Sequence, residues 1–294
     1  MNWTHSEQPE SVFALAALGP NCLAATDQGL WKWHAAQGWQ PTAPQFAQVP
    51  ISAIAASGQT VLIGSADGVA LSKDAGDTWV LATLPVKAHV LALALSPAFE
   101  QDGIAWAATA KDGVLRSPDA GANWHAWNFG LLDMSVNAMA VSPNFAEDET
   151  VFIGTELGVF LSENQGRAWR ELGFPNTSGP VTTLAIMTEP AKRGASATYT
   201  VLAGTEGNGL WISRAPYADW SRVSLKAEVV NALASMADGS LLSGLIAATT
   251  DGVFTSTNGK KWTRLTQTDD GVCLTQAGDA VVLGTAGSGV WQTA

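Results

Sequence analysis

Residues 72–79 read SKDAGDTW and residues 117–124 read SPDAGANW, so the pattern S-x-D-x-G-x-x-W occurs twice. Residues 162–169, SENQGRAW, carry Asn in place of the Asp, and residues 256–262, STNGKKW, are one residue shorter. An Asp or Asn side chain can accept backbone N–H groups within a tight turn, and Gly supplies a positive φ there. The Trp ring can then pack against its own sheet. The pattern therefore predicts a recurrent turn between two strands.

This turn is part of a longer repeat. Six segments share an apolar run, a Thr, Ser or Ala step, an acidic-Gly turn, a second apolar run and a Trp; they span residues 23–39, 61–79, 104–124, 151–169, 201–220 and 245–262. A seventh begins at Val281 and reaches residue 294 before its terminal Trp. The turn glycines are Gly29, Gly68, Gly113, Gly158, Gly209, Gly252 and Gly289, with spacings of 39, 45, 45, 51, 43 and 37 residues. A four-stranded propeller blade has a period of about 40–45 residues.

An Ala-rich apolar segment precedes each unit, starting near residues 11, 51, 90, 136, 181, 229 and 271. Alternating small and larger residues suit an innermost strand, which faces a narrow channel on one side. The seventh unit lacks its outermost strand, whereas Trp3-Thr4 matches Trp262-Thr263 and has no inner strand before it. We therefore predict an all-β fold, a seven-bladed β-propeller of four-stranded blades in a single domain over residues 1–294. Residues 1–7 are expected to complete blade seven and so remove an open sheet edge.

The composition excludes some classes of function. The chain of 294 residues has 15 Lys and Arg against 26 Asp and Glu, a formal net charge of −11. Because such a chain repels phosphates, we expect no nucleic-acid partner. Charged residues make up only 14% of the chain and hydrophobic residues 47%, which indicates a folded protein rather than a disordered one.

The two cysteines, Cys22 and Cys273, are too few for a disulfide framework. We expect two buried free thiols, with a single disulfide between the start and the end of the fold as the alternative. No residues stand at metal-ligand spacing, so no metal and no cofactor are expected. The N-terminal residues show no secretory leader, and no apolar run has the ~18 residues of a membrane span. These features favour a cytoplasmic protein or one already processed.

The S-x-D-x-G-x-x-W turns resemble those of the Asp-box, or bacterial neuraminidase repeat (BNR), family of β-propellers. The chain is also distantly similar to the propellers of photosystem II assembly and stability factors. In such propellers the turn lies on the rim away from the functional face, so the resemblance implies that its residues are structural. Here they are Ser72, Asp74, Gly76, Trp79, Ser117, Asp119, Gly121, Trp124, Ser162, Asn164, Gly166 and Trp169.

A sialidase activity is the obvious inference from such a repeat, and the residues argue against it. The resemblance would imply three arginines around a carboxylate and a Tyr nucleophile. The chain has only Tyr199 and Tyr217, both in or near the fifth unit, and the predicted innermost strands contain no Arg. A clamp for a sugar carboxylate is therefore missing at the mouth of the channel.

Acidic residues recur in the turn before the second apolar run. They are Asp27, Asp67, Asp112, Glu156, Glu206 and Asp251. Each one alone is explained as a hairpin-turn residue. Together they would form a loose acidic ring on one face, which would attract a basic partner or a cation. Two carboxylates about 5–10 Å apart would also suit a glycosidase.

Residues 127–134, WNFGLLDM, form an unusually apolar connection on the same predicted face. Trp127 and Phe129 are its candidate binding residues, since exposed aromatic side chains often form interaction hot spots. The alternative is that this loop buries itself between two blades.

From these features we predict a non-catalytic scaffold or assembly factor that binds another protein, one with a basic surface, through one face of the propeller. The alternative is a carbohydrate-active propeller, either a glycoside hydrolase or a lectin, that uses the face carboxylates and aromatics.

Overall fold

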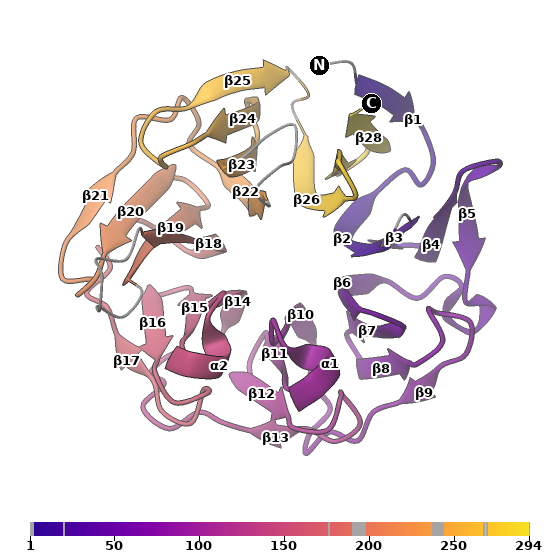
Figure 1. Ribbon diagram of the computed structural model, residues 1–294, viewed down its shortest axis with the longest axis horizontal. Helices are drawn as coiled ribbons and strands as arrows, with labels where there is room; N and C mark the ends of the chain where they lie inside the picture. Colours follow the sequence, from indigo (N-terminus) through magenta and orange to yellow (C-terminus); the bar gives the residue numbers. More distant parts are fainter. Residues whose placement is uncertain are drawn as a thin grey trace.

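The computed structural model describes residues 3–19, 21–175, 177–189, 198–236, 244–266, 268 and 270–293. Seven four-stranded antiparallel sheets are arranged as blades around a central channel (Figure 1). We letter the strands of each blade A to D from the channel outward. Residues 1 and 2, which belong to the predicted closing segment, lie outside the described residues.

The A strands line the channel, and each pairs with the B strand of its blade. The A strands are β2 (Val12–Leu18), β6 (Ile51–Ser57), β10 (Val90–Leu95), β14 (Val136–Val141), β18 (Val181–Glu189), β22 (Val230–Met236) and β26 (Gly271–Ala277). The B strands are β3 (Asn21–Thr26), β7 (Thr60–Ser65), β11 (Ala105–Thr109), β15 (Val151–Thr155), β19 (Thr198–Thr205), β23 (Gly244–Thr249) and β27 (Ala280–Thr285). Each A strand starts within one residue of the position that the sequence predicts, whereas the B strand β19 starts three residues before the predicted residue 201.

The C and D strands form the outer part of each blade. The C strands are β4 (Gly29–His34), β8 (Gly68–Ser72), β12 (Val114–Ser117), β16 (Val159–Ser162), β20 (Leu210–Arg214), β24 (Gly252–Ser256) and β28 (Val290–Thr293). The D strands are β5 (Gly38–Thr42), β9 (Val80–Leu81), β13 (His125–Ala126), β17 (Arg170–Glu171), β21 (Trp220–Arg222), β25 (Thr263–Thr266) and β1 (Trp3–Ser6). Three D strands have only two residues, so they cover little of the blade edge.

The predicted closure of the ring is confirmed. Strand β1 pairs with β28 from Trp3 opposite Thr293 to Ser6 opposite Val290, and the two strands lie side by side (Figure 1). The His5 ring stacks on Trp291 at a centroid distance of 4.4 Å. Blade seven therefore holds three strands from one end of the chain and one from the other.

Neighbouring blades pack through a large-on-small contact near the channel. The first residue of the A strand is buried, as at Val12, Val90 and Val181. At Val12, Val90, Val181 and Val230 this residue faces a Gly of the preceding blade's B strand, and a Cβ added at Gly154 would lie 2.4 Å from Val181 Cγ1. Because no methyl group fits there, the glycines of the B strands set the distance between these blades.

A bulge that the sequence analysis did not foresee occurs in every A strand. The ladder to the B strand skips the second residue each time, as between Val12 and Ala14. The other skips are at residues 52, 91, 137, 182, 231 and 272. At three of these positions a polar side chain bonds to the next blade: Ser52 donates to the carbonyl of Val90, Thr182 to that of Val230, and Asn231 to that of Gly271.

The S-x-D-x-G-x-x-W turns are held by one repeated set of hydrogen bonds. Ser72 Oγ accepts the Gly76 N–H at 2.8 Å, Asp74 Oδ1 accepts the Thr78 N–H at 2.8 Å, and Trp79 Nε1 donates to the Gly76 carbonyl at 2.9 Å. The corresponding bonds at Ser117, Asp119 and Trp124 differ by no more than 0.1 Å. In blade four Ser162 and Asn164 repeat the first two, but Trp169 donates to the Trp127 carbonyl instead.

Two details of these turns depart from expectation. The residue before the Gly also has a positive φ, 59° at Ala75 and Ala120 and 64° at Gln165, so Gly alone does not make the turn. The shorter box of blade six nevertheless closes in the same way, since Gly259 N donates to Ser256 Oγ and Trp262 Nε1 to the Gly259 carbonyl.

In the part of the chain that the structure describes, three short helical segments lie between strands. They are η1 (Pro44–Phe46), α1 (Phe99–Asp102) and α2 (Phe145–Asp148). Phe99 and Phe145 are buried beneath α1 and α2. Ser96 Oγ donates to Asp102 at 2.5 Å and Ser142 Oγ to Asp148 at 2.7 Å, so these two acids close their own loops.

The cysteines are free and buried in one cluster where blades one and seven meet. Burial raises the pKa of the Cys22 thiol to about 12 and also raises that of Cys273. The expectation of two buried thiols is confirmed, and the disulfide alternative is wrong. Within the described residues, no helix combines the length and the apolar character needed to span a bilayer.

Candidate interaction surface

The B–C turns and the D–A connections form one face of the propeller, which we call the B–C face. Asn128, in the D–A connection of blade three, donates to the Asp112 carbonyl at 2.9 Å and accepts the Val114 N–H at 2.8 Å. The A–B and C–D connections form the opposite, A–B face, where Ala75 N donates to the Gln59 carbonyl at 2.8 Å. The S-x-D-x-G-x-x-W turns therefore lie away from the B–C face.

A hydroxyl at the end of the B strand builds most B–C turns. Thr109 Oγ1 donates to the Gly113 carbonyl at 2.8 Å and accepts the Asp112 N–H at 2.9 Å. The same pairs of bonds occur at Thr26, Thr155, Thr205, Thr249 and Thr285. The turn bonds come from these hydroxyls, so the acidic side chains are not needed to close the turns.

The six predicted acids all lie on the B–C face and are exposed or half-exposed: Asp27, Asp67, Asp112, Glu156, Glu206 and Asp251. Their side chains have different partners. Asp67 forms an ion pair with Lys87 at 2.6 Å, Glu156 accepts from Ser135 Oγ at 3.1 Å, and Asp27 accepts from Gln28 Nε2 at 3.1 Å. Over the described ranges, no group of three or more His, Cys, Asp or Glu side chains is placed to hold a metal ion.

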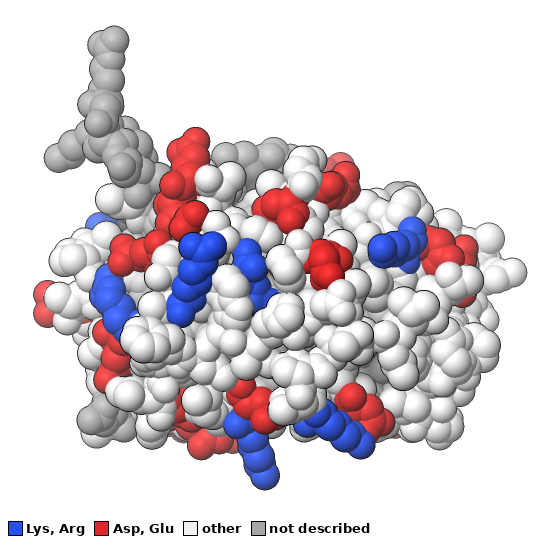
Figure 2. Space-filling view, turned by 90° about the horizontal axis from the view of Figure 1, so that it is seen from below, with Lys and Arg blue, Asp and Glu red and all other residues white. Residues whose placement is uncertain are grey.

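Negative charge is not confined to the B–C face. Figure 2, which views the ring from its side, shows acidic side chains toward both rims, with basic ones beside them. The A–B face also has acidic residues, among them Glu100, Asp119 and Glu147. Charge alone therefore does not distinguish the two faces.

Exposed apolar side chains do distinguish them. Among the described residues, the exposed large hydrophobic side chains are Phe13, Val80, Leu81, Val86, Phe129, Leu132, Met134 and Leu157. Val80 and Leu81 form the outer strand of blade two, and Phe13 lies at the start of an A strand. The other five belong to D–A connections or to a B–C turn. None of the eight belongs to an A–B or C–D connection.

The loop of residues 127–134 is partly buried and partly exposed. Leu131 is buried, whereas Phe129 is 80% exposed and Leu132 74% exposed. Trp127 is half-buried, with the guanidinium carbons of Arg116 and Arg167 4.3 and 5.7 Å from its ring centroid. The predicted pair of aromatic binding residues thus separates: Phe129 is free to meet a partner, and the Trp127 ring already packs on two arginines.

Arg116 explains why Trp127 is held in place. The side chain is buried, with Nη2 donating to Gln165 Oε1 at 2.9 Å. Its burial and the nearby positive charge of Arg167 lower the pKa of its guanidinium. Stacking on Trp127 compensates part of the lost hydration, which gives this Trp a structural role.

Asp133 fixes the exposed residues of blades three and four relative to one another. Its Oδ1 accepts the Ser135 N–H at 2.9 Å, and its Oδ2 accepts the Leu157 N–H at 3.1 Å. The backbone around Leu132 and Met134 is therefore joined to that of Leu157. We call these three exposed residues, together with Phe129 of the same loop, the blade-four patch. The sequence analysis missed Leu157, although its position beside the acid of a B–C turn was a usable signal.

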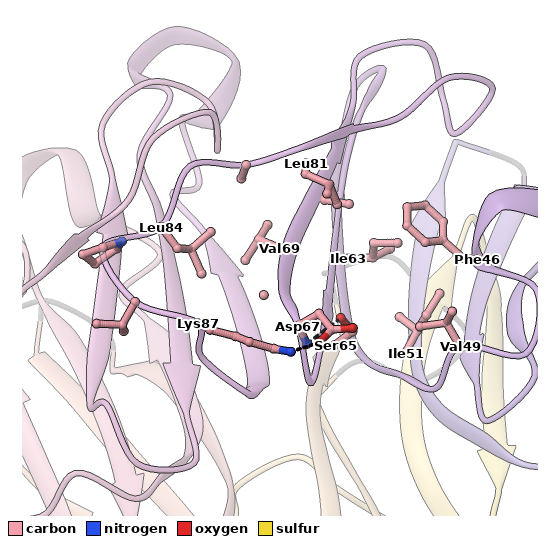
Figure 3. Close-up of a pocket in the computed structure, with 15 residues that line it drawn as sticks. Phe46, Val49, Ile51, Ile63, Ser65, Asp67, Val69, Leu81, Leu84 and Lys87 are labelled. Carbon is pink, nitrogen blue, oxygen red and sulfur yellow. Dashed lines mark hydrogen bonds and ion pairs between the residues drawn. The ribbon is translucent and has the colours of Figure 1, made fainter.

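A pocket of about 460 Å³ opens beside blade two, where the short strand β9 leaves the sheet uncovered (Figure 3). Phe46, Val49, Ile51 and Ile63 form one wall, and Val69 and Leu84 lie on the other side of the strand pair. The exposed Asp67–Lys87 ion pair lies at its edge on the B–C face. The volume is typical of small-ligand sites, which span about 300–1,000 Å³.

The two tyrosines are packed inside the protein and do not belong to the exposed groups of the B–C face. Both are buried; Tyr199 donates a hydrogen bond to Asp148 Oδ2 in the α2 loop, and Tyr217 packs edge-on against Phe152 at 5.2 Å. Burial raises the pKa of Tyr217 to about 12. Neither side chain is placed as an exposed nucleophile, which agrees with the argument against a sialidase.

No family model matches the chain, and no curated protein matches it. Solved structures do match it in fold. YCF48 bound to a D1 peptide aligns with 99% of this chain and 95% of its own, at 12% identity and a TM-score of 0.71. The extracellular domain of a putative one-component system from B. thetaiotaomicron aligns at 14% identity and a TM-score of 0.75. A GH74 xyloglucanase from Xanthomonas campestris aligns at 18% identity and a TM-score of 0.68.

The alignment covers only part of the length of the last two proteins. The chain spans 39% of the length of the one-component-system domain and 53% of that of the xyloglucanase. At these identities the similarity shows the fold and not the function. The chain is similar to these proteins as a seven-bladed β-propeller.

Proposed function

We propose that this propeller binds a protein partner through the B–C face, with the blade-four patch as its centre. The observation that carries the proposal is the one-sided exposure of large apolar side chains, with Phe129, Leu132 and Leu157 each at least 64% exposed. Exposed clusters of this kind on a folded protein are typical of interaction sites.

The charges beside the patch favour a basic partner. Both carboxylate oxygens of Asp133 accept hydrogen bonds from backbone N–H groups, and the Glu156 carboxylate accepts one from Ser135 Oγ. Neither acid forms an ion pair within the part of the chain that the structure describes. A Lys or Arg of the partner would supply that missing countercharge, and the net charge of −11 would speed its approach.

Two further inferences from the sequence stay proposals. The repeated hydrogen bonds at Ser72, Ser117 and Ser162 support placing the chain among Asp-box propellers. A scaffold or assembly role is supported by the likeness to YCF48, whose solved structure holds a peptide. In both proposals the A–B face is structural and the B–C face meets the partner.

The carbohydrate alternative has weaker support. Sugar rings stack on exposed flat aromatic faces, and the half-buried Trp127 ring packs on Arg116 and Arg167. The likeness to GH74 enzymes concerns the fold.

Affinity capture from cells of the source organism tests the proposal. We compare the wild-type protein with Leu132→Ser/Leu157→Ser and with Lys73→Ser/Glu147→Ser, a control pair of exposed residues on the A–B face. The patch variant should lose the captured protein by about tenfold or more, because central apolar anchors carry most of an interface's binding energy.

Folding of all three proteins is checked by near-UV circular dichroism. Equal recovery by the patch variant, or loss caused by the control pair, would contradict the proposal. Recovery of no protein, together with binding on a glycan array, would favour the carbohydrate alternative.

A further inference from the structure

We propose that the pocket beside blade two, which we call the blade-two pocket, binds an extended peptide segment with apolar side chains followed by a Lys or Arg. The inference rests on the proposed function in taking the partner to be a protein, and it adds the chemistry of the segment that is recognised. No residue of the blade-four patch lines this pocket.

The walls of the pocket explain why the proposed segment has apolar side chains. Phe46, Val49, Ile63 and Leu84 present aliphatic or aromatic surface to a space of about 460 Å³. At its mouth Leu81 is 81% exposed, although it is apolar and belongs to a strand. The two-residue strand β9 cannot cover this surface, so two or three apolar side chains of another segment would gain burial there.

The edge of the pocket on the B–C face explains the basic residue of the proposed segment. Asp67 lies at this edge, and its only ion-pair partner among the described residues is Lys87, at 2.6 Å (Figure 3). Lys87 belongs to residues 84–87, LPVK, which line the pocket. The chain itself thus places an ammonium group, after apolar residues, on this carboxylate. A partner segment of the same chemistry would repeat that contact.

The contact between Asp67 and Lys87 is readily exchanged. Both side chains are at least 70% exposed, and an exposed ion pair contributes little to stability. The turn of Asp27 also borders the pocket, because Gln48 N donates to the Gln28 carbonyl and Val49 is a lining residue.

Synthetic peptides test the inference directly. The probes are acetyl-Gly-Leu-Leu-Lys-Gly-amide and the same peptide with norleucine or Glu in place of Lys, and the dissociation constants are measured by calorimetry. The wild-type protein should bind the Lys peptide about two- to fivefold more tightly than the norleucine peptide, and the Glu peptide most weakly.

Three variants identify the groups involved. Lys87→Ala removes the internal competitor and should strengthen binding of the Lys peptide about two- to fivefold. Asp67→Asn should abolish the preference for Lys over norleucine, whereas the matched control Asp112→Asn should keep it. Leu81→Ser should weaken both peptides about five- to tenfold.

Several results would overturn the inference. These are no binding of any peptide, equal affinity for the Lys, norleucine and Glu peptides, or weaker binding of the Lys peptide by Lys87→Ala. Concentration-dependent dimerisation that Leu81→Ser abolishes would assign the pocket to a second copy of the chain instead. If the peptides fail while Leu132→Ser/Leu157→Ser still loses the captured protein, this inference fails and the proposed function stands.

Discussion

At the residue scale, the serine that opens each S-x-D-x-G-x-x-W turn is the critical polar group. Ser72 is buried, and its Oγ accepts the Gly76 N–H and donates to Asp74 Oδ1, both at 2.8 Å. We predict that Ser72→Ala lowers the free energy of unfolding by about 1–3 kcal/mol, because the buried Gly76 N–H loses its acceptor. Urea denaturation measures this loss.

The control for that prediction is Ser221→Ala, at an exposed position of β21, which should change stability by no more than about 0.5 kcal/mol. Equal effects of the two substitutions would show that the Ser72 bonds do not stabilise the turn.

Asp74 gives the turn a pH dependence. Hydrogen bonds from the Thr78 side chain and backbone, and then from Ser72, lower the pKa of Asp74 from 3.8 to about 2. Since the folded pKa lies below the unfolded one, the stabilisation is complete above pH 3.8 and is lost as the pH falls through about 2. The stability difference between wild type and Asp74→Ala should therefore shrink over that range.

Thermal denaturation at several pH values measures this effect. Asp74→Asn should keep part of the stability with little pH dependence, as Asn164 accepts the Ala168 N–H in the same turn of blade four. A difference between wild type and Asp74→Ala that stays constant down to pH 2 would contradict the assignment.

At the element scale, the contacts between blades depend on missing methyl groups. A Cβ at Gly154 would lie 2.4 Å from Val181 Cγ1 of the next blade. We predict that Gly154→Ala costs about 1–3 kcal/mol through overpacking. Adding Val181→Ala should recover part of that loss, which a double-mutant cycle by urea denaturation detects. Purely additive losses would contradict the packing account.

The elements also show what the sequence can and cannot predict. The recurring glycines and Ala-rich runs place the blades, because β-periodicity and turn residues act locally. The bulge at the second residue of each A strand has no local signal, since Phe13, Ser52 and Asn137 share no chemistry. It follows from how neighbouring blades fit around the channel.

At the scale of the whole molecule, closure of the ring joins the two ends of the described chain. Four residue pairs link β1 to β28. We predict that deleting residues 1–7 lowers the free energy of unfolding by about 2–6 kcal/mol, since those ladder bonds are lost and β28 becomes an open edge. Calorimetric melting measures the loss, and an unchanged melting temperature would contradict closure as a stabilising device.

The candidate site was predictable only in part. The acids of the B–C turns and the apolar loop of blade three could be read from the sequence, because each has a fixed place in the repeat. Which apolar side chains are exposed could not, because Leu131 and Leu132 are neighbours and only one is buried. Similarly, the distant residues Arg116 and Arg167 determine that the Trp127 ring is covered.

The central claim is that the B–C face, and not the A–B face, meets a protein partner. Site-specific photocrosslinking in cells of the source organism tests it most directly, with benzoylphenylalanine placed at Phe129, Leu132 or Leu157, or at Lys73, Glu147 or Lys260 on the opposite face. We predict that the first three positions give one discrete protein adduct and the second three give none. Adducts from the A–B face alone, or equally from both faces, would contradict the account.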